Sequence, residues 1–263
     1  MKKFSIICIF PNLNGEKYME KTIKSFLNQP IKNKKMIIVD GKSTDKSFEI
    51  IKKYKKNRSN IYWIKYKDKG LYDAHNKGLK FLKFDKNEIY CNIGNDDIYK
   101  KNIYADVINN FEKYPKIGAL YYDHEIKIKN KNKIQKKYSK CIKKNINILN
   151  LKIFGNIAAG HNVFIKTKYL KKFKFCTKLK YSGDYYSYLH LVKNKNCKFK
   201  YIPKAANLSY AGENISTKYI YEGALEALKV YYRTFGIDMI FFYRIILVIK
   251  TRFTTLLKNF LRE

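Results

Sequence analysis

The sequence contains few residues that cross-link a chain or interrupt regular structure. Its 263 residues include five cysteines and four prolines, and no two cysteines form a Cys-x-x-Cys pair. An odd number of widely spaced cysteines argues against a disulfide framework and favours reduced thiols. The four histidines have no zinc-type spacing with these cysteines, so the sequence also argues against a zinc site.

Long apolar runs are also absent. No stretch reaches the roughly 20 apolar residues that a membrane-spanning helix needs. The short apolar segment near the start is interrupted by Pro11, Asn12 and Asn14, and no small-residue cleavage site follows it. We therefore expect this segment to be a strand rather than a signal peptide, and we expect a cytoplasmic protein.

Acidic residues are scarce. The chain has 21 Asp and Glu against 56 Lys and Arg, which gives a formal net charge of +35. Such a charge attracts nucleic acid, an anionic membrane face or phosphorylated substrates. The abundance of Lys, Asn, Ile and Tyr also fits drift in genome composition, with much of the lysine as solvated surface. The charge therefore leaves the partner open.

Apolar runs and helical spacings alternate through the first hundred residues. This pattern implies βαβ units and a parallel sheet, and therefore an α/β fold. The expected strands are 4–10, 35–40, 61–66 and 88–93, separated by helices at 16–29, 46–54 and 72–81.

The second half of the sequence is less regular. It predicts strands at 119–128, 160–165 and 198–202, a hairpin or loop at 126–144, and helices at 183–191, 220–232 and 237–261. We find no internal repeat and no Pro/Gly/Ser-rich linker. We therefore expect one domain over residues 1–217 and a helical tail over 218–263.

Several acids follow the expected strands of the first half. Asp40 ends one strand, Asp68 follows the next, and Asp96 and Asp97 follow the fourth. Ligands of open parallel sheets bind at the carboxyl ends of the strands, so these acids predict a site at one edge of the sheet. The alternative for each is a turn or helix cap, a common role for Asp.

The turn Gly94–Asp97 carries the strongest local signal. Its adjacent carboxylates repel each other unless a cation lies between them. Mg²⁺ or Mn²⁺, held by one or two carboxylates and completed by substrate phosphates, would supply that charge. Lys100 and Lys101 are the alternative source of neutralisation.

Two nucleotide-binding motifs can be rejected. Gly41-Lys42-Ser43 is like the end of a P-loop, but Met36 stands where that motif needs its first glycine. The sequence also has no Gly-x-Gly-x-x-Gly, so a nicotinamide enzyme has no support.

Short segments in a fixed order resemble another class of enzyme. They are Ser5–Ile7, Pro11–Gly15, Ile37–Asp45, Asp68–Gly78, Asn95–Asp97, Gly160–Phe164, Gly183–Tyr185 and Tyr210–Ser216. Together they resemble the family 2 glycosyltransferases of GT-A fold, in the branch that assembles cell-surface polysaccharide and lipopolysaccharide. This sequence differs from the family pattern at Asn95, where the family has an acidic residue, and at Lys42 and Glu213, where the family has glycine.

The resemblance implies an inverting, metal-dependent enzyme of the hexosyltransferase type with a nucleotide-sugar donor. Asp40 would accept hydrogen bonds from the nucleobase, for which we expect uracil, and Pro11 and Asn14 would shape the nearby loop. Asp68 and Asp73 would lie near ribose and diphosphate.

The remaining implied roles concern phosphate, metal and acceptor. Lys69 would face phosphate, Asp96 would contact ribose or sugar, and Asp97, with Asp96, would bind the metal. Asp184 would be the general base that deprotonates the acceptor hydroxyl. His161 would lie near the acceptor or the diphosphate. The alternatives are a helix N-cap for Asp184 and a satisfied core histidine for His161.

The tail is apolar and basic together. Residues 239–249 are nearly all apolar but include Arg244, and Lys250, Arg252 and Lys258 follow. We expect residues 237–261 to form an interfacial helix at an anionic membrane surface, which would suit a lipid-linked saccharide acceptor. The alternative is packing on the core or on a second subunit, so a homodimer stays open.

Two other function classes compete with a glycosyltransferase. The charge and the 16% aromatic content would fit a nucleic-acid-binding protein, but no such motif is present and we expect no nucleic-acid partner. An inactive scaffold with the same fold is the third alternative.

Overall fold

The computed structural model describes residues 4–67, 69–128, 134–137, 146–155, 159–211 and 219–260. The first half contains β1 (Ser5–Asn12), α1 (Glu16–Leu27), β2 (Lys34–Asp40), α2 (Ser47–Lys55), β3 (Ile61–Lys65), α3 (Leu71–Leu79), β4 (Glu88–Asn92), β5 (Asp97–Tyr99) and α4 (Ile103–Lys113). The second half contains β6 (Ala119–Ile128), β7 (Ile134–Lys137), α5 (Ile148–Phe154), η1 (Gly160–Asn162), β8 (Val163–Lys166), η2 (Thr167–Leu170), α6 (Gly183–Lys195), β9 (Phe199–Ala211), α8 (Ile220–Phe235) and α9 (Met239–Phe260).

Within the described ranges, nine strands form one sheet in the order β3-β2-β1-β4-β8-β6-β9-β5, with β7 paired to β6. Strands β1 to β4 are parallel to one another, as the βαβ pattern predicts. Strand β8 runs antiparallel to β4 and β6, and β5 runs antiparallel to β9. The expected α/β class, with a sheet flanked by helices, is confirmed.

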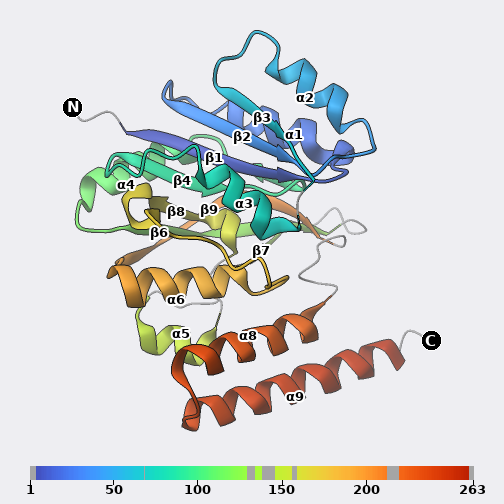
Figure 1. Ribbon diagram of the computed structural model, residues 1–263, viewed down its shortest axis with the longest axis vertical. Helices are drawn as coiled ribbons and strands as arrows, with labels where there is room; N and C mark the ends of the chain where they lie inside the picture. Colours follow the sequence, from blue (N-terminus) through green and yellow to red (C-terminus); the bar gives the residue numbers. More distant parts are fainter. Residues whose placement is uncertain are drawn as a thin grey trace.

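Both faces of the sheet are buried, which explains the continuous apolar runs of the first strands. Side chains alternate between faces along a strand. In β1, Ile6, Cys8 and Phe10 pack in the core with α1, α2 and α4, whereas Ile7 and Ile9 pack in the core with α3 and α6. Figure 1 shows α8 and α9 beyond α6, with α9 outermost.

The parallel strands end at one edge, and this edge carries the polar loops. Asn12 ends β1, Asp40 ends β2 and Asn92 ends β4, and the register places Asn12 beside Asp40. Strand β5 begins at Asp97, immediately after the Gly94 turn. The fold therefore brings the loops after β1, β2 and β4 together.

The sequence did not predict every element. Strand β5, helix α4 and helix α5 were not anticipated, and β9 extends to Ala211 rather than ending near residue 202. The hairpin alternative for 126–144 is confirmed in part, because β7 pairs with β6; the rest of that range lies mostly outside the described residues.

The two tail helices pack on the helical layer that contains α5 and α6 (Figure 1). The expected boundary between residues 217 and 218 lies outside the described residues. In the part of the chain that the structure describes, no helix has both the length and the apolarity needed to cross a bilayer.

Candidate active site

Asp40 is held in place by the loop that follows β2 and by the end of β1. Its carboxylate is almost completely buried. Asn12 Nδ2 donates a hydrogen bond to Asp40 Oδ1 at 2.7 Å, and Ser43 donates to the same carboxylate from Oγ at 2.5 Å and from its backbone N–H at 3.2 Å. Asn12 Oδ1, also buried, has no hydrogen-bond partner among the described residues. This unpaired acceptor lies at the end of β1, beside Asp40, at the position expected for the nucleoside.

The loop between β1 and α1 approaches the acidic loop closely. Asn14 has a φ of 51°, and its Oδ1 accepts a hydrogen bond from the Thr44 backbone N–H at 2.8 Å. A Cβ on Gly15 would lie 2.4 Å from Asn12 Oδ1 and 2.5 Å from Asn95 Cγ. Glycine at position 15 therefore lets these two loops meet. Pro11, which pairs with Val39 in the sheet, precedes this turn.

The residues at the start of α3 form a local cluster. Asp73 Oδ2 accepts from the Lys69 backbone N–H at 3.0 Å, and Lys77 Nζ lies 2.9 Å from the same carboxylate. Burial alone would raise the pKa of Asp73, but the hydrogen bond from Lys77 and other contacts keep that pKa below its ordinary value. Asp73 thus has partners without any ligand, and the Lys69 side chain is exposed. Asp68 lies outside the described residues.

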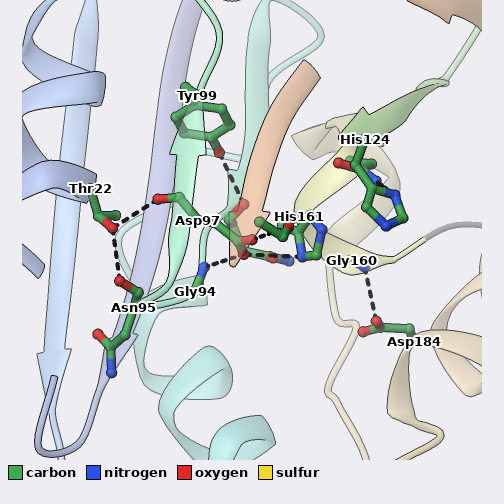
Figure 2. A network of polar contacts seen from close by, with 12 residues as sticks. Thr22, Gly94, Asn95, Asp97, Tyr99, His124, Gly160, His161 and Asp184 are labelled. Atoms are coloured by element: carbon green, nitrogen blue, oxygen red, sulfur yellow. Dashed lines mark hydrogen bonds and ion pairs between the residues drawn. The ribbon is translucent and has the colours of Figure 1, made fainter. Parts of the chain in front are cut away.

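Asp97 lies at the start of β5 and is 2% exposed. Its Oδ2 accepts from the Gly94 backbone N–H at 3.1 Å, and its Oδ1 accepts from Ser209 Oγ at 2.5 Å. Thr22 Oγ1 donates to the Asp97 backbone oxygen at 2.8 Å (Figure 2). The Gly94 turn and β9 thus hold the carboxylate, and α1 holds the backbone of the same residue.

His161 faces Asp97 from the other side of the site (Figure 2). Its Nδ1 lies 3.2 Å from Asp97 Oδ2, while its buried Nε2 has no hydrogen-bond partner within the described part of the chain. Within the described residues the ring is thus paired with Asp97 through Nδ1, and Nε2 is left unpaired. Lys100, offered above as a neutralising cation, contacts Glu125 Oε2 instead, at 2.5 Å.

Asp96 is partly buried beside Asp97, and its backbone oxygen accepts from the Tyr210 N–H at 3.2 Å. Among the described residues, no group of three or more His, Cys, Asp or Glu side chains forms a complete metal site. Asp97 and His161 nevertheless fit a hard divalent cation that takes its other ligands from Asp96, substrate phosphates and water. The approach of His161 Nδ1 to Asp97 Oδ2, at 3.2 Å, is the structural observation that supports this fit.

Asp184 lies in the first turn of α6, on the other side of the η1 turn. Its Oδ2 accepts from the Gly160 backbone N–H at 3.0 Å (Figure 2), so the carboxylate bonds a distant segment rather than capping its own helix. Burial raises the pKa of Asp184 above its ordinary value, against smaller lowerings by the Gly160 hydrogen bond and by His161. A cavity of about 20 Å³ beside the carboxylate, lined also by Tyr90, Ser187 and Tyr188, is large enough for one water molecule.

The dipeptide Gly160–His161 connects the two acids. Gly160 bonds Asp184 through its N–H, and the His161 ring faces Asp97. This short turn therefore has the Asp184 carboxylate, whose pKa is raised, on one side and the pair of His161 and Asp97 on the other. Asn12, Ser43 and Ser209 belong to this site but were not singled out in the sequence; for Asn12 the signal was its position between Pro11 and Asn14.

The site can be compared with known proteins. The profile described as Glycosyl transferase family 2 matches residues 7–173. The chain belongs to glycosyl transferase family 2.

Two curated relatives of this family 2 chain have names that include amino sugars. A dolichyl N-acetyl-alpha-D-glucosaminyl phosphate 3-beta-D-2,3-diacetamido-2,3-dideoxy-beta-D-glucuronosyltransferase from Methanococcus voltae is 41% identical over 80 residues, covering 28% of this chain and 25% of that protein. A poly-beta-1,6-N-acetyl-D-glucosamine synthase from Staphylococcus aureus (strain COL) is 29% identical over 107 residues, covering 41% and 25%. The chain thus spans about a quarter of the length of these relatives.

Solved structures agree with the family at the level of the fold. S. aureus TarS in complex with UDP-GlcNAc has a TM-score of 0.66 at 18% identity, covering 89% of this chain and 68% of that chain. The mannosyltransferase PcManGT from Pyrobaculum calidifontis, in complex with GDP-Man and Mn²⁺, has a TM-score of 0.66 at 13% identity, covering 90% and 66%. The GT-A fold that the sequence predicts for this family 2 chain is confirmed.

Proposed function

We propose that the protein is an inverting glycosyltransferase that transfers a sugar from a nucleotide-sugar donor to a saccharide or lipid-linked acceptor in surface glycan assembly. The observation that carries this proposal is the arrangement around Gly160–His161, which separates Asp184 from Asp97 by one turn. A transferase of this kind needs a base for the acceptor and a charged site for the departing diphosphate, and it needs them close together.

The donor nucleoside binds in the loops around Asp40. The carboxylate and the unpaired Asn12 Oδ1 offer acceptors for N–H and O–H groups of the base and ribose. Pro11 and Asn14 shape the loop beside them. We expect uracil as the base. One structure of similar fold contains UDP-GlcNAc, which supports a UDP-sugar donor. Another contains GDP-Man, so guanine is the alternative base.

The donor diphosphate lies toward Asp97 and His161. Mn²⁺ or Mg²⁺ bound there, with Asp96 close by, would neutralise the charge that develops on the departing nucleoside diphosphate. Asp97 is already oriented by Gly94 and Ser209, so the chain holds this ligand before the donor arrives. By the family resemblance, Lys69 would face the donor phosphates, and Asp68 and Asp73 would bind near its ribose and diphosphate.

The acceptor hydroxyl binds beside Asp184. An alcohol is a poor nucleophile until its proton leaves, and the ionised Asp184 takes that proton as the oxygen attacks the anomeric carbon. Because attack and departure occur on opposite faces of one carbon, a single displacement inverts the configuration. The proton remains on Asp184 until the product leaves.

The acceptor is lipid-linked, and the outer face of α9 contacts an anionic membrane surface. This face exposes Met239, Phe242, Ile246, Ile249 and Phe253 at helical spacing, between 57% and 89% exposed. Exposed apolar patches of this size mark interaction sites. Helix α9 contains no acidic residue, and its exposed charges at positions 250 and 252 are basic, which favours anionic lipid over a second copy of this basic chain.

Transfer can be tested by incubating the protein with a set of UDP-sugars, GDP-mannose and Mn²⁺, with and without lipid extract. We expect nucleoside diphosphate release from one donor, faster with acceptor present. No release from any donor, together with saturable and salt-dependent nucleic-acid binding, would favour the nucleic-acid alternative. No release and no nucleic-acid binding would favour an inactive scaffold.

A further inference from the structure

The loop that leads into α6 is held by a single carboxylate from the tail. Glu226 of α8 accepts hydrogen bonds from three consecutive backbone N–H groups, those of Lys180 at 2.8 Å, Tyr181 at 2.7 Å and Ser182 at 2.7 Å. Ser182 Oγ also donates to the Gly223 backbone oxygen of α8 at 2.9 Å. Helix α8 thus fixes the backbone directly before the first turn of α6.

The N–H groups near a helix start have no partner within the helix, and a negative group is favourable there. Glu226 meets both needs from outside the helix. The next N–H, that of Gly183, donates to Tyr72 Oη at 2.9 Å, so α3 holds the loop from the other side. Four successive amides therefore have side-chain acceptors, and Asp184 is the residue that follows them.

The residue after Asp184 is held by the other tail helix. Arg244 of α9, 8% exposed, donates from Nη1 to Tyr185 Oη at 2.6 Å. Its guanidinium group also lies 4.9 Å from the centre of the Tyr185 ring. A Cβ on Gly155, which has a φ of 73°, would lie 2.8 Å from Arg244 Nη2, so α5 leaves room for this contact. Residues 180–182, before Gly183, and Tyr185, directly after Asp184, are thus both tied to the tail helices.

We propose that Glu226 is a positioning residue for the base: it holds residues 180–182 so that the Asp184 carboxylate lies beside Gly160 and the acceptor site. This inference rests on the proposed function, in which Asp184 is the base. Glu226 touches no substrate in this arrangement and acts through the backbone alone. The tail is then part of the catalytic apparatus and does more than extend the surface.

Glu226→Gln tests the inference, because the amide keeps one oxygen but places an NH₂ group against backbone N–H donors. We expect kcat for transfer to fall by about tenfold to a hundredfold, since small misplacements of reacting groups have effects of that size. The donor KM and the calorimetric affinity for UDP with Mn²⁺ should stay near the wild-type values, because Glu226 contacts only the loop of the base. Glu226→Asp, which keeps the charge but is one methylene shorter, should give an intermediate kcat and guards against a Gln variant that fails to fold.

Glu222→Gln is the matched control. Glu222 is exposed one turn earlier on the same helix, so its change removes the same charge and leaves the three backbone hydrogen bonds of Glu226 in place. The kcat of this variant should equal that of wild type. The inference is overturned if Glu226→Gln and Glu226→Asp keep the wild-type kcat, or if kcat and UDP affinity fall together. If wild type binds UDP and transfers sugar, and the Glu226 variants do so equally well, only this inference is overturned. If wild type itself does not transfer sugar, the proposed function is overturned as well.

Discussion

At the scale of single residues, the acids of the site are held by partners from distant parts of the chain. Asp40 and Asp97 could be singled out because each follows a buried apolar run. Their partners Asn12 and Ser209 lie 28 and 112 residues away along the chain, so no local pattern could predict those contacts. Asp73 shows the opposite case: its contact with Lys77, four residues on, is local and was overlooked.

Asp184→Asn should lower kcat by about 10² to 10⁴-fold, because the isosteric amide cannot accept the acceptor's proton. UDP affinity in the presence of Mn²⁺ should stay unchanged, since Asp184 lies on the acceptor side. Steady-state kinetics and calorimetry on the same preparation measure both quantities. Asp85→Asn, an exposed carboxylate change at the opposite end of β4, is the control; a kcat for Asp184→Asn equal to that control would exclude Asp184 as the base.

The rate of transfer should depend on pH through Asp184. Burial raises the pKa of this carboxyl, so the protonated, inactive form persists to higher pH than for an ordinary Asp. We expect kcat/KM to rise with pH through that raised pKa and then to level off. A pH series on wild type measures this, and an acid limb at the ordinary value for aspartic acid would contradict it.

At the scale of elements, the strong periodic patterns were the predictable ones. Strands β1 to β4 and helices α1 to α3 follow from buried runs and helical faces near one another in the chain. Strand β5 has only three residues and exists because it pairs with β9, a contact that sequence spacing does not reveal. Strand β9 was predicted too short because Pro203 and Lys204 interrupt its apolar pattern, although its ladder with β6 continues through a register shift.

Gly183→Ala should damage both stability and activity, because α6 packs tightly on α3. A Cβ at this position would lie 2.2 Å from Cζ of the buried Tyr72 ring. We expect overpacking to cost about 1–3 kcal/mol in the free energy of unfolding, measured with urea, and kcat to fall as Asp184 moves. Gly223→Ala is the control: its Cβ would meet only the Tyr181 Cβ, at 3.4 Å, so stability should hold or rise. Equal stability of the two variants would show that α6 can shift freely.

At the scale of the whole molecule, the net charge of +35 is not explained by the proposed site, because that site is built around carboxylates. The charge fits the proposed membrane face better than a nucleic-acid surface, because α9 combines basic residues with an exposed apolar stripe. Sequence periodicity predicted this helix, but only the packing of Arg244 and Val248 against the protein shows which face is left outward.

Vesicles rich in anionic lipid should bind the protein, and phosphatidylcholine vesicles should bind it weakly. Ile246→Ser, at a side chain 63% exposed on α9, should reduce flotation with anionic vesicles by about tenfold, since burying one such side chain contributes roughly 1.5 kcal/mol or more. Phe81→Ser, at a side chain 42% exposed elsewhere, should not change it. Concentration-dependent dimers that Ile246→Ser abolishes, without vesicle binding, would instead identify α9 as a subunit interface.

Calorimetric titration of UDP, with and without Mn²⁺, tests the proposed site most directly when wild type is compared with Asp97→Asn and Asp97→Ala. The proposal assigns Asp97 and His161, 3.2 Å apart, as metal ligands beside the donor diphosphate. UDP should therefore bind wild type in a metal-dependent manner, and both substitutions should abolish the metal dependence while the thermal transition still shows a folded protein. Metal-independent UDP binding that both variants retain, or binding of neither UDP nor GDP under any metal condition, would contradict the proposed donor site.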